Sequence, residues 1–237
     1  MHRQGLGALV HNDQWTHLLR AGATRWFDPG ERLIRQHDHD RTVYLLVEGT
    51  VKVYTHRPDG AESLLALRGP GESLGEFAAL SGLPRTATVA ASGGPCLTRA
   101  LPADRFREMI RELALDQVLW QHMVRRQSES DSMRAVVAGL PASRRLASAL
   151  VCMAGMLGLD VTGWPNRCAP ERNTAPRGTV LQLGLSQQEL GEWIGLSRAS
   201  VAAELSRMRS QGIIRTGRQS IAVLDLDRLY RLAASES

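Results

Sequence analysis

Residues 185–214, LSQQELGEWIGLSRASVAAELSRMRSQGII, decide the fold of the C-terminal part of the chain. Ser186 and Glu189 have the spacing of a capping box, which predicts a helix that starts at Ser186. Gly195 predicts a turn after it, and Ser197 predicts the cap of a second helix. Apolar residues at i, i+4 and i+7 give that helix a buried stripe of Val201, Leu205 and Met208. The stretch therefore predicts a helix-turn-helix, the motif that places a helix in a DNA groove.

The next segment, residues 213–224 (IIRTGRQSIAVL), predicts two short strands around Gly217, as in a winged helix. An ordinary helical hairpin with a solvated outer face is the alternative, and the two strands favour the winged form. The spacing and residue types resemble the Crp/Fnr family of bacterial transcription regulators, which includes the cyclic AMP receptor protein. The resemblance is carried by Gln188, Glu189, Gly195, Ser197, Arg198, Val201, Leu205 and Gly212.

The resemblance implies that Arg198 contacts a guanine edge in the major groove. At two further positions from which family members read bases, this chain has alanine, which offers only apolar contact. We therefore expect an operator that differs from that of the cyclic AMP receptor protein. The alanines are Ala199 and Ala203, and the implied phosphate contacts are Gln188, Ser197 and Ser200.

Length and charge agree with a two-part DNA-binding protein. A chain of 237 residues can bury two separate cores. The net charge is +5, and residues 140–237 hold 12 Arg and 8 acidic groups, so that +4 of it lies with the helix-turn-helix. This surplus suits phosphate contact, although basic proteins that bind no nucleic acid also exist.

Residues 26–91 have a different composition, in which short runs rich in Val, Leu and Tyr are separated by glycines. Residues 43–54, VYLLVEGTVKVY, predict two strands around Glu48-Gly49. Short strands with frequent turns predict a closed or rolled antiparallel sheet. Before it, Leu6 to Ala21 predicts one amphipathic helix.

Residues 71–91, GESLGEFAALSGLPRTATVAA, contain what a buried phosphate diester needs. Gly75 permits close backbone approach, the following turn presents N–H donors, and Arg85 supplies a cation with Thr86 beside it. Glu76 can accept a hydrogen bond from a ribose 2′-hydroxyl. The N–H donors are those of Glu76, Phe77 and Ala78.

This segment resembles the phosphate-binding cassette of cyclic-nucleotide-binding domains, through GEFAA and RTA. The resemblance implies cyclic AMP or another cyclic nucleotide as effector. Many relatives keep the roll but bind another effector or none. In that alternative, Arg85 and Glu76 form a structural ion pair at the mouth of an empty roll.

After the roll, Pro102 predicts the start of a helix, and a longer helix is expected from about Leu115 to Gly139. Its apolar seam suits a partner helix in a homodimer, and its polar middle must meet water, a partner or a ligand. By resemblance, Ser130 reaches the purine base, and Asp131 replaces a second hydroxyl, which puts the base specificity in doubt.

The expected fold is α+β: an N-terminal antiparallel β-roll of the cyclic-nucleotide-binding (jelly-roll) type, a long dimerisation helix and a C-terminal winged helix-turn-helix. The boundaries are 1–101 for the helix and effector-binding roll, 102–140 for the helical region and 141–237 for the DNA-binding domain. Pro141 marks the hinge, a further helix is expected over 144–155, and residues 158–178 predict a loop.

Several classes of site are disfavoured. Cys96, Cys152 and Cys168 are widely spaced, so neither a disulfide framework nor a zinc site is expected. By resemblance, an iron–sulfur cluster is also disfavoured, because the oxygen-sensing branch of the family uses cysteines near the N-terminus and this chain has none before Cys96. The run 37–40 (HDHD) falls at a turn, which favours a solvated loop over a metal site, and His122 is assigned to the surface or an interface rather than to haem. No membrane span, leader or catalytic constellation is found, so we expect a cytoplasmic protein that is not an enzyme.

These observations predict a homodimeric transcription regulator that binds a pseudo-palindromic double-stranded DNA operator under effector control, with RNA polymerase as a partner if it activates. Two alternatives remain open. One is a regulator of the same fold that is constitutive or senses another signal, such as a cyclic dinucleotide. The other is a cyclic-nucleotide-binding module that acts on a protein partner.

Overall fold

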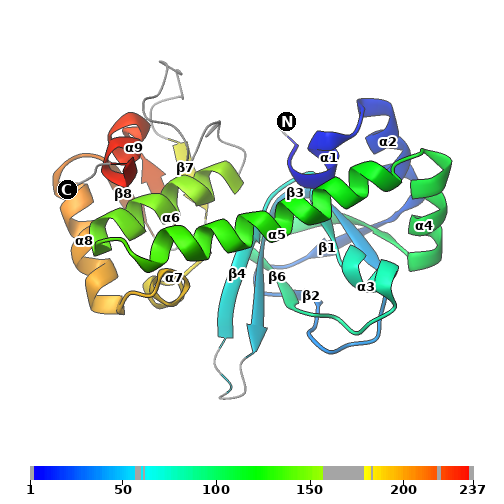
Figure 1. Ribbon diagram of the computed structural model, residues 1–237, viewed down its shortest axis with the longest axis horizontal. Helices are drawn as coiled ribbons and strands as arrows, with labels where there is room; N and C mark the ends of the chain where they lie inside the picture. Colours follow the sequence, from blue (N-terminus) through cyan, green and yellow to red (C-terminus); the bar gives the residue numbers. More distant parts are fainter. Residues whose placement is uncertain are drawn as a thin grey trace. The chain divides into compact units, whose positions relative to one another are not determined.

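The computed structural model describes residues 3–56, 60, 62–156, 179–182, 184–217 and 220–234, without the side chains of 129–138, 156 and 179–182. It divides into two compact units, Met1–Asp131 and Ser132–Ser237 (Figure 1). The first unit combines an antiparallel sheet with helices, and the second is a winged helix-turn-helix. This architecture confirms the predicted α+β fold class.

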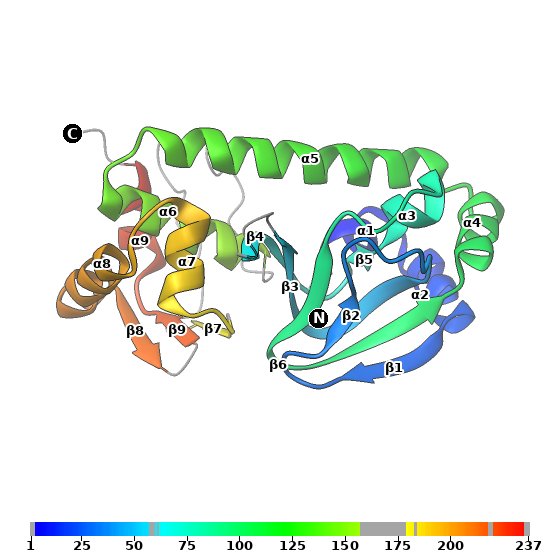
Figure 2. The same cartoon turned by 90° about the horizontal axis from the view of Figure 1, so that it is seen from below.

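The sheet of the first unit has six strands, all paired antiparallel. The strands are β1 (Ala23–Phe27), β2 (Arg32–Ile34), β3 (Val43–His56), β4 (Glu62–Arg68), β5 (Ser73–Leu74) and β6 (Thr88–Leu101). They pair in the order β1-β6-β3-β4, while β2 also pairs with β6 and β5 with β3. Figure 2 shows these strands curving around an interior, with β3 and β6 running through the whole roll.

Two of these strands are long, and one of them, β3, joins what was predicted as two strands. β3 and β6 each have 14 residues, and β3 continues through Glu48-Gly49, where two strands were expected. The pairing shifts register on both sides of Glu48, and Gly49 has a φ of 87°. A Cβ at Gly49 would lie 2.5 Å from the carbonyl oxygen of Pro95 on β6. The chain therefore bulges against its neighbour at this glycine and does not reverse direction.

The N-terminal helix is also divided. α1 (Gly5–Leu9) and α2 (Asn12–Ala21) replace the single helix predicted over Leu6–Ala21, because Val10 and His11 are extended. The backbone N–H of His11 donates to the Gln14 side chain at 3.0 Å, which caps a new helix start. The other helices of this unit are α3 (Glu76–Ser81), α4 (Ala103–Glu112) and α5 (Asp116–Ala138).

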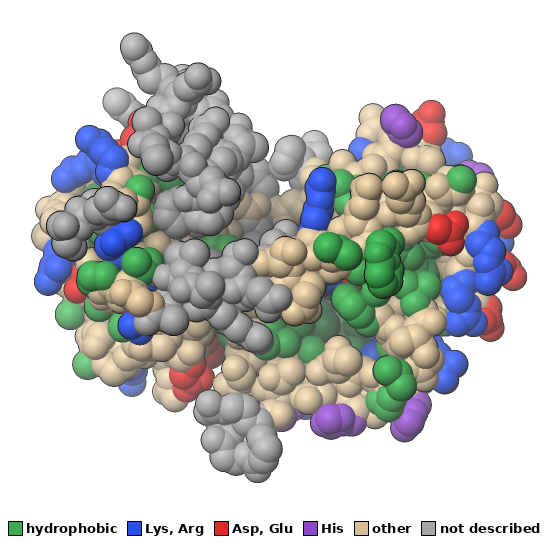
Figure 3. All heavy atoms as spheres, viewed as in Figure 1, with side chains coloured by type: hydrophobic (Ala, Val, Ile, Leu, Met, Phe, Trp, Pro, Cys, Tyr) green, Lys and Arg blue, Asp and Glu red, His purple; other side chains and the backbone are tan. Residues whose placement is uncertain are grey.

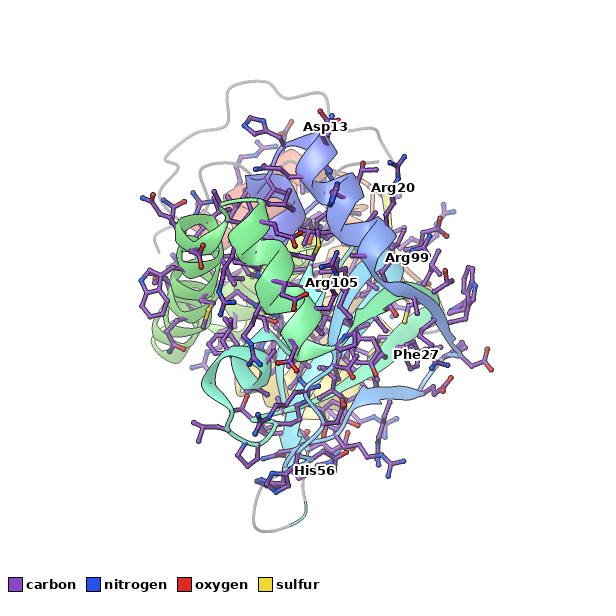
Figure 4. The ribbon with its side chains drawn as sticks, turned by 90° about the vertical axis from the view of Figure 1, so that its right-hand side faces the viewer. Asp13, Arg20, Phe27, His56, Arg99 and Arg105 are labelled. Atoms are coloured by element: carbon purple, nitrogen blue, oxygen red, sulfur yellow. The ribbon has the colours of Figure 1, made fainter. Side chains whose placement is uncertain are left out.

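Two clusters of buried side chains hold the first unit together. One joins the helices to the sheet, with Leu18 of α2, Val43 and Leu45 of β3, and Phe106 of α4. The other fills the roll, with Ile34, Leu46, Val51, Leu74 and Val89. Figure 4 views this unit from the side of α2, which carries Asp13 and Arg20, and α4, which carries Arg105. The first cluster also contains Leu115, which precedes α5, and Leu119 of α5, and so it packs the start of α5 against this unit.

The second unit contains α6 (Ala142–Met156), which begins after Pro141 and includes the helix predicted over 144–155. It continues with β7 (Thr179–Gln182), α7 (Gln187–Ile194), α8 (Arg198–Ser210), β8 (Ile214–Gly217), β9 (Ser220–Val223) and α9 (Leu226–Ala234). The wing has three strands in the order β7-β9-β8, one more than predicted. The loop predicted over 158–178, with Cys168, lies outside the described residues.

The three-part division at 101 and 140 stays a prediction. The structure divides the chain between Asp131 and Ser132, within the region assigned to the helical segment.

Candidate functional site

A cavity of about 380 Å³ opens into the roll of the first unit. A volume of this size lies in the range of small-molecule sites. Its floor is apolar and includes Ile34, Val53 and Val89, while residues 75–78 and 85–87 supply polar groups and backbone donors. Arg126 and Gln127 of α5 complete the lining. The segment predicted to bind a phosphate therefore lines a cavity of suitable size.

Arg85 lies at this cavity with a side chain that is 2% exposed. Its Nη1 donates to the carbonyl oxygen of Gly75 at 2.8 Å. Its Nη2 donates to Asp40 Oδ2 at 2.9 Å and to the carbonyl oxygen of Thr42 at 2.6 Å. Burial opposes the ionisation of Asp40, but hydrogen bonds from Arg85 and Thr42 outweigh it and hold the pKa of Asp40 below its ordinary value. Asp40 is therefore ionised beside the guanidinium at neutral pH.

Gly75 ends β5 and caps α3 with a φ of 88°, in the left-handed region. A Cβ at this position would lie 2.3 Å from Arg85 Nη1 and 3.0 Å from the carbonyl oxygen of Thr42. Glycine is thus required both by the backbone conformation and by the close approach of Arg85. The first N–H groups of α3 have no acceptor within the helix, as at any helix start. They belong to Glu76, Phe77 and Ala78, the predicted donors.

Glu76 is completely buried, and its Oε1 forms an ion pair with Arg126 of α5. The same arginine donates to the carbonyl oxygen of Ser73 at 3.0 Å. The second carboxylate oxygen, Oε2, is buried and has no hydrogen-bond partner. The alternative of an empty roll predicted an ion pair between Arg85 and Glu76, and this pair does not form. Arg85 pairs with Asp40 instead, and Glu76 pairs with Arg126.

The remaining predicted effector residues differ in their surroundings. Ala78 is buried, Phe77 is 41% exposed, and Thr86 is an exposed residue at the cavity. Ser130 and Asp131 belong to the helical backbone of α5, but their side chains lie outside the described residues.

The helix-turn-helix of the second unit follows its sequence signals closely. Ser186 Oγ accepts from the Glu189 N–H at 3.1 Å, and the Glu189 carboxylate accepts from the Ser186 N–H at 2.8 Å. Gly195 ends α7 with a φ of 67°. Ser197 then caps α8, and its Oγ accepts from the Ser200 N–H at 3.0 Å. The predicted stripe of Val201, Leu205 and Met208 is buried.

The start of α8 presents the predicted DNA-contact residues to solvent. Arg198, Ala199 and Ala203 are exposed, as is the cap Ser197. The Ser200 hydroxyl is half-buried and lies 2.9 Å from the Ser197 hydroxyl. On α7, the exposed Gln188 side chain donates to Glu192 at 3.0 Å. Arg198 is the first residue of α8, and its exposed side chain lies at the N-terminal end of the predicted recognition helix.

The comparisons with known proteins match both units. Residues 24–112 match the cyclic nucleotide-binding domain family, and residues 144–232 match the Crp-like helix-turn-helix domain family. The CRP-like cAMP-activated global transcriptional regulator of Mycobacterium tuberculosis is 28% identical over 214 residues, which cover 87% of this chain and 81% of that protein. The chain belongs to the Crp/Fnr family of transcription regulators.

Further relatives and solved structures match most of the chain. The cAMP-activated global transcriptional regulator CRP of Pasteurella multocida is 27% identical, covering 81% of this chain and 85% of its own. TTHB099, a CRP family transcriptional regulator from Thermus thermophilus, superimposes with a TM-score of 0.67 at 25% identity, covering 89% of this chain and 97% of its own. FixK2 from Bradyrhizobium japonicum superimposes with a TM-score of 0.70 at 20% identity, covering 91% of this chain and 99% of its own. The family models and the CRP relatives confirm the predicted family, and the structural matches confirm the predicted fold.

In this Crp/Fnr regulator, His122, which was predicted to lie at the surface or an interface, is buried between α5 and β5. It is 2% exposed, and its Nε2 lies 3.3 Å from Ser73 Oγ and 3.6 Å from Glu72 Oε2. Burial, together with nearby arginines, lowers the pKa of His122 to about 3. The imidazole is therefore neutral at physiological pH, and its contact with Ser73 is a neutral hydrogen bond between α5 and β5.

Sequence reasoning missed two residues of this regulator's cavity region, Asp40 and Arg126. Asp40 was assigned to a solvated turn, and no local pattern pairs it with a residue 45 positions away. Arg126 lies 50 positions from Glu76, in a polar stretch that was predicted to meet water, a partner or a ligand, without a prediction for Arg126 itself. Both residues reach the cavity region through contacts between segments that are distant in the sequence, and a local pattern does not show such contacts.

The described residues contain neither a cluster of three metal-binding side chains nor a helix that is long and apolar enough to span a membrane.

Proposed function

We propose that this Crp/Fnr regulator is a homodimer whose affinity for operator DNA is controlled by a cyclic nucleotide bound in the roll. The observation that carries the proposal is the buried Oε2 of Glu76, which has no hydrogen-bond partner at a cavity that also holds Arg85. An unsatisfied buried carboxylate oxygen is costly unless a ligand donates to it. A ribose 2′-hydroxyl is a donor of the required kind.

The cavity residues fit the other parts of such a ligand. Arg85, Thr86 and the first N–H groups of α3 would hold the phosphate. The apolar floor, with Val53 and Ala66, would contact the base. The Mycobacterium tuberculosis and Pasteurella multocida relatives are described as cAMP-activated, which supports a cyclic nucleotide as the effector.

Homodimerisation is supported by an exposed apolar stripe on α5. Trp120 is 66% exposed, and Val124, one turn later, is 51% exposed. Figure 3 shows hydrophobic side chains gathered on the surface over α5 and α3. Exposed apolar surface on a helix favours a contact with another molecule. A second copy of the same helix would cover this stripe and relate two recognition helices by a twofold axis.

Control of DNA binding then follows from a shift between two dimer arrangements. The nucleotide binds more tightly when the paired α5 helices set the two α8 helices one turn of DNA apart. Arg126 supports this coupling, because it joins α5 directly to Glu76 and Ser73 at the cavity. A pseudo-palindromic operator matches such a dimer, and RNA polymerase would be a partner of an activator.

Isothermal titration calorimetry with cyclic AMP and cyclic GMP tests the effector. The intact protein should bind at least one of them, and Arg85→Ala should bind it at least about tenfold more weakly, because a charge-assisted hydrogen bond is lost. Binding of neither nucleotide, or unchanged binding by the variant, would contradict the proposed effector.

One observation favours a second candidate, a regulator of the same fold that needs no cyclic nucleotide or senses another signal. Arg85 already has an anionic partner in Asp40, so the guanidinium does not require a ligand for charge balance. DNA binding that is equally tight with and without nucleotide would support this candidate. A module that acts only on a protein partner would instead show no salt-dependent binding to duplex DNA.

A further inference from the structure

The hydrogen bonds of Arg85 occupy the parts of the guanidinium that usually bind an anion. A guanidinium binds a phosphate or carboxylate best through two parallel N–H groups along one edge. A guanidinium has two such edges, one formed by Nη1 and Nη2 and the other by Nε and Nη2. Nη2 therefore contributes one hydrogen to each edge. Nη2 faces two acceptors, Asp40 Oδ2 at 2.9 Å and the Thr42 carbonyl oxygen at 2.6 Å. A phosphate that approaches either edge of Arg85 therefore finds Nη2 already hydrogen-bonded to Asp40 and Thr42.

Asp40 is also held in place from its own side. Its Oδ1 accepts from the Thr42 hydroxyl at 2.9 Å and lies 3.3 Å from the Thr42 backbone nitrogen. The carboxylate side chain is 56% exposed, while the Arg85 side chain that it contacts is 2% exposed. An ionised carboxylate thus reaches from the solvent side onto a buried guanidinium at the cavity wall.

The orientation of Arg85 does not depend on Asp40 alone. Two backbone carbonyl oxygens, of Gly75 and Thr42, accept from Nη1 and Nη2 and would hold the guanidinium if the carboxylate charge were removed. The contribution peculiar to Asp40 is its negative charge, which offsets the positive charge that an anionic ligand would use. Two anions on one guanidinium repel each other.

We infer that Asp40 is an internal anion that competes with the phosphate of the effector for Arg85, and so sets the effector affinity below what the cavity would otherwise give. The inference rests on the proposed function for its ligand, a cyclic nucleotide. It assigns Asp40 the role of an affinity-determining residue on the loop between β2 and β3.

The test uses the full-length protein with the substitution Asp40→Asn. Asparagine has nearly the same shape, and its amide oxygen can still accept from Arg85 and Thr42, so that mainly the charge is lost. Calorimetry should show cyclic-nucleotide binding that is about tenfold tighter than in the unmodified protein. Asp38→Asn is the matched control, because Asp38 is an exposed acid of the same loop. It should leave the affinity unchanged.

A double-mutant cycle identifies the group through which Asp40 acts. The gain from Asp40→Asn should disappear in an Arg85→Ala background. Affinity that is unchanged or lower in Asp40→Asn would overturn the inference and leave the proposed function intact. Equal gains in the presence and absence of Arg85 would also overturn it.

A second measurement separates this inference from the identity of the effector. If no cyclic nucleotide binds any variant, the proposed effector is wrong, and inorganic phosphate becomes the probe. Thermal unfolding should then show greater stabilisation by phosphate in Asp40→Asn than in Asp38→Asn. Equal stabilisation of the two variants would overturn the competition between Asp40 and an anion.

Discussion

At the scale of single residues, Gly75 is needed both for the backbone conformation before α3 and for the position of Arg85 at the proposed ligand site. Its φ of 88° disfavours a side chain, and a Cβ would lie 2.3 Å from Arg85 Nη1. Gly75→Ala should displace the guanidinium and weaken cyclic-nucleotide binding by about tenfold or more in calorimetry.

Gly82 provides the control for Gly75→Ala. It has a comparable φ of 75°, but the nearest atom to an added Cβ, Arg41 Nη2, is 3.8 Å away. Gly82→Ala should therefore lower stability through the same backbone strain and leave nucleotide affinity almost unchanged. Equal losses of affinity in the two variants would show that strain, rather than the contact with Arg85, is responsible.

His122 makes a prediction about stability and pH. Its pKa in the folded protein is lowered to about 3 from an ordinary value of 6.5, so the unfolded chain binds the proton more readily. The stabilising effect is present above pH 6.5 and is lost as the pH falls toward 3. Urea unfolding should lose about 2 kcal/mol between pH 7 and pH 5 from this group alone. A His122→Gln variant should show a smaller loss, and an unchanged pH profile would contradict the neutral, buried state.

At the scale of elements, the cap of α8 allows folding and DNA contact to be separated. Ser197→Ala removes the bond to the Ser200 N–H and should lower stability by about 1 kcal/mol. Ser197→Asp retains a cap but brings a negative charge to a proposed phosphate contact. It should fold stably and bind duplex DNA more weakly. Normal DNA affinity in Ser197→Asp would remove Ser197 from the phosphate contacts.

The exposed stripe of α5 predicts the oligomeric state. Trp120→Glu should shift the protein from dimer to monomer in light scattering at micromolar concentration, because a charge would be buried in the helix pair. Trp26→Glu is the control, since Trp26 is similarly exposed, at 61%, but lies on β1. Dimerisation that survives Trp120→Glu would place the interface elsewhere.

The elements also differ in how well they could be predicted from the sequence. The helix-turn-helix is predictable residue by residue because its caps at Ser186 and Ser197 and its turn at Gly195 are local interactions. The division of the N-terminal helix at Val10 and the continuous course of β3 were not predictable. The course of β3 depends on a distant contact, that of Gly49 with β6, while the new helix start is a local cap at His11 and Gln14 that the apolar pattern of the segment did not indicate.

The same distinction applies to the candidate site. The cassette residues Gly75 and Arg85 could be predicted to lie together, because they share one short segment. The partners that set their charge could not be, since Asp40 and Arg126 come from a separate loop and helix. The third wing strand, β7, and the buried state of His122 were missed for the same reason.

At the scale of the whole molecule, the account depends on coupling between the cavity of one unit and the DNA-binding helix of the other. The first unit offers a ligand a buried acceptor in Glu76, and the second offers DNA an exposed Arg198. A ligand shifts an equilibrium only by its difference in affinity for two states. Nucleotide binding and DNA binding should therefore strengthen each other by the same factor.

Fluorescence anisotropy with a duplex selected from a random pool tests this coupling most directly. Titrations at fixed salt are made with and without cyclic AMP or cyclic GMP, for the intact protein and for Arg85→Ala. We predict that at least one nucleotide increases the affinity of the intact protein for the selected duplex at least about fivefold, and that Arg85→Ala loses this increase. Equal affinity with and without either nucleotide, or no preference for the selected duplex over a scrambled one, would contradict the account.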